Sequence, residues 1–299
     1  MRLGVALALA VLAMVAFGIV VSTQASATLN EDVQNDLTSL STSQANQLDK
    51  WVSNTKSSLR GTSAHPALDG GGADGADEYL TALSERDALP ESTVGVHYLN
   101  TDSGVIEASS RDEFVGVSPA EQGAPFATDP PTFAGDSDVV VTAPFEVSVA
   151  DFPVVAVISP VADSADRRLI YMVDVNALTR DFSSVADGSG TAIVTDDGTT
   201  VAHTDPERTA TAYDGPLLDR SLSQSAFETD GSTVTAGTPV DGANWAVLVR
   251  TPASEAFALG DYVASSIIGL ILVTVVSLAL VGVTMGSTTV VSLRQLSAR

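Results

Sequence analysis

The feature that most constrains this chain is an uncharged stretch near its C-terminus, from Tyr262 to Leu293. Its centre, from Ile267 to Met285, is almost wholly apolar. Because an α-helix rises about 1.5 Å per residue, roughly 20 apolar residues cross the hydrocarbon core of a bilayer. The stretch lacks the polar stripe of a surface helix. It therefore predicts a transmembrane helix over residues 262–288, and the alternative is a helix buried in a protein core.

A second apolar run, from Leu3 to Val21, lies at the N-terminus. Its length favours an uncleaved transmembrane anchor over residues 1–27. The alternative is a signal peptide, because Ala25-Ser26-Ala27 offers a cleavage site of small residues. Arginines flank the outer ends of both runs, which predicts that both tips lie in the cytoplasm. The predicted location is therefore the cell membrane, with two spans and an extracellular main domain.

The composition is strongly acidic, and this indicates which partners the protein can bind and what kind of organism it comes from. The 299 residues include 37 Asp and Glu against 14 Lys and Arg, for a formal net charge of -23. This balance argues against nucleic-acid binding, which needs basic residues at the phosphates. The absence of Cys excludes a disulfide framework and thiolate metal sites. With lysines only at Lys50 and Lys56, the composition favours a salt-accumulating halophile over an ordinary acidic protein.

Residues 28–60 predict a long extracellular helix. Apolar residues recur at helical spacing from Leu29 to Leu59, with acidic and amide residues between them. The apolar stripe is thin, so two interpretations remain open. The helix either contacts a second copy in a homodimer or packs only on its own domain. Gly70-Gly71-Gly72 then breaks the helical pattern.

An internal repeat defines the region between the helix and the second apolar stretch. A β-rich run, a glycine-containing turn and a returning strand occupy Val94–Ser109, and the same unit recurs at Thr191–His203. Each unit has a later companion hairpin, at Val154–Val175 and Val234–Val249. The pattern predicts an α+β fold, with two tandem PAS-like modules of antiparallel sheet and helices on one face.

The order of these elements resembles the double Cache (dCache) extracellular sensor domain of methyl-accepting chemotaxis transducers, here of a haloarchaeal type, and of sensor kinases. Four segments carry the resemblance: Tyr98–Ser109, Ile158–Leu178, Ala192–Glu207 and Thr238–Pro252. It implies a membrane-distal module at 77–182 and a membrane-proximal module at 183–257. The tail at 289–299 looks like the start of a HAMP linker, so the chain is expected to be a fragment truncated there.

The resemblance also implies a ligand site in the distal module, between its sheet and the segment Gly116–Glu146. Amino-acid-binding members carry an Arg-x-Trp-Tyr cluster there, and we find only Pro-Phe pairs. Asp174 matches the family acid that pairs with a ligand ammonium group, and its alternative role is a cap of the following helix. The other candidate binding residues are Tyr98, Ser109, Phe126 and Phe145, of which the two phenylalanines could instead be core residues.

No catalytic arrangement is visible in the sequence. The three histidines, His65, His97 and His203, are far apart, and no metalloprotease, nucleophile-elbow or phosphate-loop motif occurs. Asp-x-Gly segments fit turns better than calcium loops. We therefore expect no enzyme activity, no cofactor and no metal site.

The predicted function is the extracellular ligand-sensing region of a transmembrane signal-transducing receptor, a chemotaxis transducer. The alternatives are the sensor of a histidine kinase and, from another class, a membrane-anchored enzyme or a structural cell-surface protein. The expected partners are a small-molecule ligand, such as an amino acid or an amine-like molecule, a second copy in a homodimer, and cytoplasmic signalling proteins acting through a missing C-terminal part.

Overall fold

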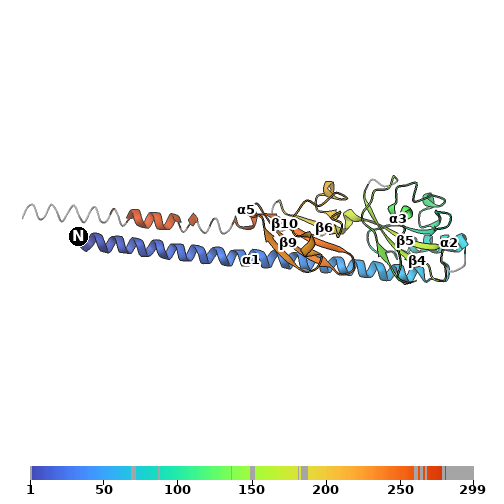
Figure 1. Ribbon diagram of the computed structural model, residues 1–299, viewed down its shortest axis with the longest axis horizontal. Helices are drawn as coiled ribbons and strands as arrows, with labels where there is room; N and C mark the ends of the chain where they lie inside the picture. Colours follow the sequence, from blue (N-terminus) through green and yellow to red (C-terminus); the bar gives the residue numbers. More distant parts are fainter. Residues whose placement is uncertain are drawn as a thin grey trace, which may run out of the picture. The chain divides into compact units, whose positions relative to one another are not determined.

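The computed structural model describes residues 2–68, 72–86, 88–135, 137–148, 152–180, 182, 188–258, 262, 265–266, 268–277 and 280. The chain divides into two compact units. One unit combines residues 1–36 with residues 253–299, and the other comprises residues 37–252. The second unit contains both sheets and the candidate site (Figure 1).

The first element is the helix α1, Arg2–Ser63, of 62 residues. Its length differs from the predicted division into an anchor at 1–27 and a separate helix at 28–60. No proline or glycine pair interrupts the sequence between these segments, so the helical hydrogen bonds continue through them. The helix ends at Ser63, shortly before Pro66, because the residue that precedes a proline is disfavoured in helical geometry.

Neither of the two predicted membrane spans is identified in the structure. Among the residues described above, no helix is both long and apolar enough to cross a bilayer. Most of the second half of the predicted span at 262–288 and all of the tail at 289–299 lie outside the described residues.

The first sheet has five antiparallel strands in the order β2-β1-β5-β4-β3. The strands are β1 (Thr93–Asn100), β2 (Val105–Ser109), β3 (Val140–Val141), β4 (Val154–Pro160) and β5 (Arg167–Asp174). The central strands β4 and β5 are buried over most of their length, as expected when both faces of a sheet are covered.

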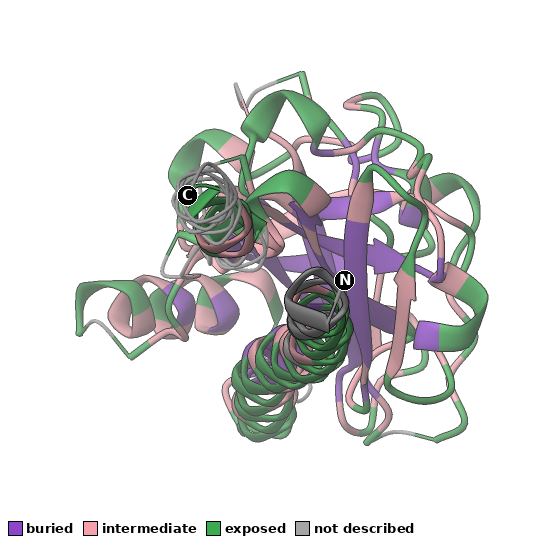
Figure 2. Ribbon diagram, turned by 90° about the vertical axis from the view of Figure 1, so that its left-hand side faces the viewer, coloured by how far each residue is buried: buried purple, intermediate pink, exposed green. Residues whose placement is uncertain are grey.

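The second sheet repeats the same topology in the order β7-β6-β10-β9-β8, again wholly antiparallel. Its strands are β6 (Gly190–Thr195), β7 (Thr200–His203), β8 (Ala226–Thr229), β9 (Thr233–Val240) and β10 (Trp245–Pro252). The predicted α+β class, with a long N-terminal helix and two antiparallel sheets, is confirmed. Buried residues concentrate on the strands (purple in Figure 2).

Short helices fill the connections. They are α2 (Gly72–Glu85), η1 (Asp112–Phe114), α3 (Pro125–Thr128), η2 (Val175–Thr179), η3 (Pro206–Arg208), α4 (Leu218–Ser221) and α5 (Ala253–Ala256). The helix α2 begins at Gly72, which has positive φ, and continues through a sequence with three alanines.

Residues 37–63 of α1 pack along one face of both sheets. At the first sheet, the Tyr171 hydroxyl lies 2.7 Å from Thr62 Oγ1, and Ser63 Oγ lies 3.2 Å from Ser159 Oγ. At the second sheet, Gly242 N donates to Asp49 Oδ1 at 3.1 Å. Residues 37–63 therefore pack on their own domain, and the contact of this helix with a second copy stays a prediction.

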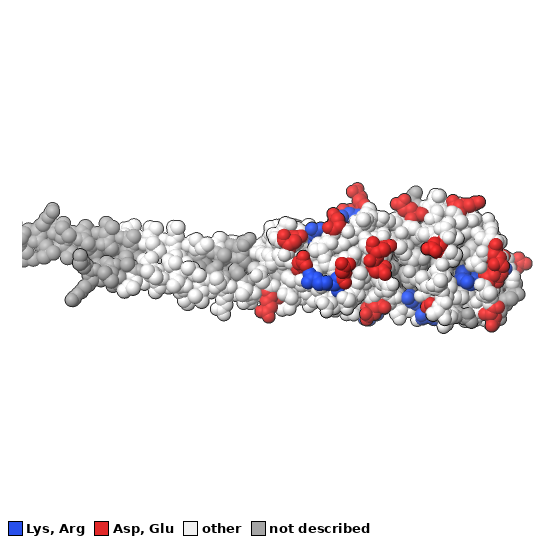
Figure 3. Space-filling view, viewed as in Figure 1, with Lys and Arg blue, Asp and Glu red and all other residues white. Residues whose placement is uncertain are grey.

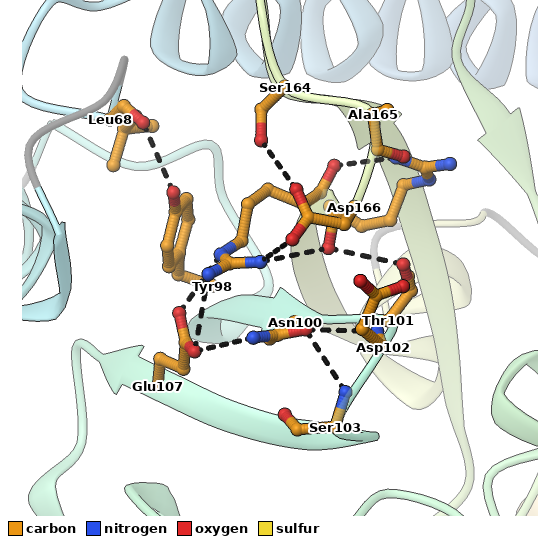
Figure 4. A network of polar contacts seen from close by, with 12 residues as sticks. Leu68, Tyr98, Asn100, Thr101, Asp102, Ser103, Glu107, Ser164, Ala165 and Asp166 are labelled. Atoms are coloured by element: carbon orange, nitrogen blue, oxygen red, sulfur yellow. Dashed lines mark hydrogen bonds and ion pairs between the residues drawn. The ribbon is translucent and has the colours of Figure 1, made fainter.

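A polar network closes one end of the first sheet (Figure 4). Asn100 Nδ2 donates to Glu107 Oε1 at 2.7 Å, which ties the two strands of the first hairpin together. Arg167 Nε lies 3.0 Å from Glu107 Oε2 and also pairs with the Asp166 carboxylate. Thr101 N donates to Asp166 O at 2.9 Å, so the turns after β1 and before β5 are joined.

Candidate functional site

The first sheet carries a cavity of about 340 Å³ on the face opposite α1. Alternation along β5 places Tyr171 on the α1 side and Ile170 and Met172 on the cavity side. The segment around η1 and α3 covers this second face (Figure 1). The cavity therefore lies between the sheet and an irregular segment, which is the location that the family resemblance implied for the ligand site.

The lining is mainly apolar. Its apolar residues are Val94, Ile106, Phe114, Val117, Pro119, Ala124, Phe126, Val147, Phe152, Val154, Ile170 and Met172. Such a lining, interrupted by a few polar groups, is typical of small-molecule sites. Three polar side chains interrupt it here: His97, Arg111 and Gln122.

His97 is a neutral polar group in the cavity wall. Its Nδ1 lies 2.9 Å from Ser109 Oγ, and its ring packs 4.9 Å from the ring of Phe114. Burial, with the nearby Arg111 charge as a second cause, lowers the pKa of His97 to about 4. The imidazole is thus uncharged near neutral pH and can serve only as a hydrogen-bonding group there.

Arg111 supplies the positive charge of the cavity. It lies two residues after the end of β2, and its backbone N donates to Ser109 Oγ at 3.0 Å, which anchors its position. The ion pair of its guanidinium with Glu113 is weak. The distance from Nε to Glu113 Oε1 is 3.4 Å, and the two side chains are 51% and 64% exposed. Exposed pairs of this kind are weak, so a ligand anion can compete with Glu113 for Arg111.

Two of the residues predicted from the sequence lie at or next to this cavity. Phe126 lines it, and Phe145 packs against Phe126 edge-to-face at 5.8 Å without being part of the lining. Both rings are buried in the apolar cluster of the module. Ser109 is fully buried behind the wall and positions His97 and Arg111. Direct ligand contacts by these residues stay predictions.

Asp174 and Tyr98 lie outside the cavity lining. The Asp174 carboxylate accepts from Asn176 N at 2.9 Å and caps η2, which is the alternative role given above. Asp174 nevertheless follows Met172 by two residues, on the same face of β5. Tyr98 points to the opposite face, where its hydroxyl donates to Leu68 O at 3.1 Å (Figure 4). Their roles in binding a ligand stay predictions.

Three residues of the cavity wall were not among those predicted from the sequence: His97, Arg111 and Gln122. Alternation along β1 could have placed His97 beside Leu99 on one face, and Arg111 could have been noted as the first basic residue after a predicted strand. Within the part of the chain that the structure describes, no group of three or more His, Asp or Glu residues could hold a metal ion.

The fold is similar to that of solved sensor domains. No family model matches the chain. Its architecture is that of chemoreceptor ligand-binding domains. The domain of Pseudomonas fluorescens CtaA in complex with L-isoleucine aligns with a TM-score of 0.57 and 17% identity, covering 78% of this chain and 97% of that chain. The periplasmic sensory domain of Campylobacter jejuni Tlp1 aligns with a TM-score of 0.58 and 13% identity, covering 77% and 98%.

Particular relatives come from a haloarchaeon. The transducer protein CosT of Halobacterium salinarum is 28% identical and covers 99% of this chain and 39% of CosT. The transducer protein BasT of the same species is 27% identical and covers 92% of this chain and 35% of BasT. The chain thus spans little more than a third of the length of these relatives. The resemblance to the sensor region of a haloarchaeal transducer is confirmed.

Proposed function

We propose that this chain is the extracellular ligand-sensing region of a transmembrane signal-transducing receptor of the chemotaxis-transducer class. The observation that carries the proposal is the cavity of the first module, whose wall is apolar apart from a few polar groups and contains one weakly paired Arg. The fold of chemoreceptor ligand-binding domains and the relatedness to haloarchaeal transducers support it. A receptor of this kind binds its ligand without chemical change, so no enzyme activity is proposed.

The cavity suits a small zwitterion with an apolar side chain. Its volume of about 340 Å³ is at the lower end of the range for ligand pockets. The ligand carboxylate would replace Glu113 as the ion-pair partner of Arg111. A guanidinium can bind a carboxylate through two parallel hydrogen bonds. The apolar lining would receive the ligand side chain. Asp174, further along the same face of β5 as Met172, would meet the ammonium group at the mouth.

A histidine-kinase sensor remains the alternative output, because both receptor types use such a sensor fold. The sequence of the gene downstream of Arg299 distinguishes the two: a methyl-accepting coiled coil supports the transducer, and a kinase core contradicts it. In either case the cytoplasmic partners would act through that downstream part, after the HAMP-like start at 289–299.

We further propose that the apolar segments at 1–27 and 262–288 anchor the chain in the membrane. The first unit exposes large apolar side chains, among them Leu12 at 68%, Phe17 at 70% and Leu270 at 72%. Exposed apolar side chains in such number require apolar surroundings. The modules at 77–182 and 183–257 would then lie outside the cell, and residues 28–60 would provide the contact of a homodimer.

Protease treatment of intact cells tests this topology. We expect loss of the region between Asn30 and Asp261, with short protected fragments at both ends. Protection of that whole region in intact cells, together with its digestion after lysis, would contradict an extracellular main domain.

Calorimetry on the detergent-solubilised chain tests the ligand site. We expect saturable binding of L-isoleucine or L-leucine, and at least a tenfold loss of affinity in Arg111→Gln, because one charge-assisted interaction contributes about 1.5–3 kcal/mol. Arg220→Gln is the matched control, since Arg220 is exposed in the second module and pairs with Glu228. Equal affinities in Arg111→Gln and Arg220→Gln would remove Arg111 from the site.

A further inference from the structure

The second module has a cavity of its own, of about 480 Å³, on the corresponding face of its sheet. Its wall includes His203, Arg208, Tyr213 and Arg250, together with hydroxyl groups from Thr200, Thr204, Thr211, Thr233 and Thr251. This wall is more polar than that of the first module and carries two guanidinium groups.

The two cavities are built by equivalent backbones. In the first sheet Gly95 pairs with Met172, and in the second Gly190 pairs with Arg250. Each hairpin is closed by a hydroxyl that accepts from a backbone N of the neighbouring strand, Ser110 from Val96 at 2.9 Å and Thr204 from Thr191 at 3.1 Å.

The equivalence extends through the short helices η1 and η3. Gly116 and Ala210 both have positive φ, +82° and +59°, and each donates its N–H to a strand residue at 2.8 Å. Counting back from these two positions, Phe114 of the first module corresponds to Arg208 of the second. The fold has therefore kept the cavity while two apolar wall residues, Met172 and Phe114, are replaced by arginines.

Arg250 is a cation of this wall with only weak protein partners. Its Nε is buried and has no hydrogen-bond partner within the described residues. Its Nη2 is held only at long range, 3.4 Å from Thr233 Oγ1 and 3.9 Å from Asp230 Oδ2. A buried guanidinium N–H without an acceptor is costly, so this arrangement favours a bound acceptor in the cavity.

His203 presents a second donor. Its Nδ1 accepts from Asp205 N at 2.8 Å, so the proton of the neutral ring resides on Nε2. Burial, and then the Arg208 charge, lowers the pKa of His203, which favours this neutral form. Gly190 makes room for the ring, since a Cβ there would lie 3.3 Å from His203 Cε1.

The acidic groups near the cavity are already engaged. Asp214 pairs with Arg208 at 3.2 Å, and Asp205 caps η3 by accepting from Glu207 N at 3.3 Å. Asp230 accepts from the backbone N atoms of Ser232 and Thr233 in its own turn. Arg250 is thus left as the charge with the weakest protein partner in this wall.

We propose that the cavity of the second module is a second ligand site that takes a small carboxylate, with Arg250 as its charge partner and His203 Nε2–H as a further donor. A planar carboxylate matches the fork of a guanidinium, and the threonine hydroxyls supply hydrogen bonds for a hydroxylated chain. The receptor would then bind two ligands of different chemistry, a zwitterion with an apolar side chain in the first module and a polar carboxylate in the second.

Titration calorimetry on the detergent-solubilised full chain, with sodium acetate, L-lactate and L-malate as probes at constant high KCl, tests the proposal. We expect saturable binding of at least one probe, at least a tenfold weaker affinity in Arg250→Gln, and no change in Arg220→Gln. If none of the three probes binds at concentrations up to about 10 mM, well above common metabolite affinities, the proposal fails.

A second variant protects the test against a folding defect. Ala212 lines the cavity and is exposed at its rim, so Ala212→Phe narrows the opening without filling the core. We expect Ala212→Phe to weaken carboxylate binding while its melting temperature stays near that of the parent chain. Carboxylate affinities unchanged in both variants, or displacement of the bound carboxylate by inorganic phosphate at equal concentration, would overturn the assignment.

Discussion

Met172 and Arg250 occupy the same position in the two sheets, each paired with a glycine, Gly95 or Gly190, of the neighbouring strand. The side chain at this position faces the cavity of its module. A thioether there leaves the wall apolar, and a guanidinium makes it cationic. This position is one of two, with that of Phe114 and Arg208, at which an apolar wall residue of the first cavity corresponds to an arginine of the second.

Exchange of this side chain is the first prediction. Met172→Arg places an unpaired charge at a side chain that is 9% exposed, so we expect the free energy of unfolding to fall by about 2–4 kcal/mol and L-isoleucine binding to be lost. Met172→Leu, which conserves volume, should cost less than about 1.5 kcal/mol. Chemical denaturation and calorimetry measure both, and equal stability of the two variants would contradict a closed apolar wall.

His97 predicts a pH dependence of stability. Its pKa in the folded chain is about 4, below the ordinary value of 6.5, so the folded state binds fewer protons than the unfolded state between these values. The stability is therefore fully present above about pH 6.5 and falls with decreasing pH, by about 3 kcal/mol at pH 4. In His97→Gln this component should vanish. The difference between parent and variant, measured by denaturation from pH 7 to 4, isolates it from the carboxylates, and parallel curves would contradict the prediction.

The close contact between Gly242 and α1 allows a prediction about packing between the second sheet and this helix. A Cβ at this residue would lie 2.8 Å from Val52 Cγ1, so Gly242→Ala should destabilise the second unit by about 1–3 kcal/mol. Gly61→Ala is the matched control, because nothing lies within 4 Å of a Cβ there, and alanine should stabilise the helix by up to about 1 kcal/mol. Opposite signs are expected in thermal unfolding, and a destabilised Gly61→Ala would argue against the helix geometry.

The acidic surface predicts stabilisation by salt. Asp and Glu side chains are spread over the face shown in Figure 3, with few Lys and Arg between them. At a formal net charge of -23, repulsion among these groups should loosen the fold in dilute buffer, and salt should screen it. We expect a higher melting temperature in molar KCl than at about 0.1 M. Equal temperatures would contradict the interpretation as a halophilic protein.

Much of the fold could be predicted because its signals are local. The hairpin at Val94–Ser109 and its counterpart at Thr191–His203 need only alternating β-rich residues and a glycine turn. The continuity of α1 through residue 28 was missed. The composition changes there from apolar to acidic, and a change of composition was read as a boundary although nothing in the backbone breaks the helix.

The repeat, the helical and strand segments and the apolar stretches are set by the sequence itself, since each depends on neighbours within a few residues. The tertiary structure alone decided which side chains share a cavity. Alternation along β1 places Tyr98 and His97 on opposite faces. Only the assembled sheet shows that the Tyr98 hydroxyl meets Leu68 O while His97 faces the cavity. Arg111 and Arg250 likewise gain their roles from strands distant in sequence, because pairing register is a property of the assembled sheet.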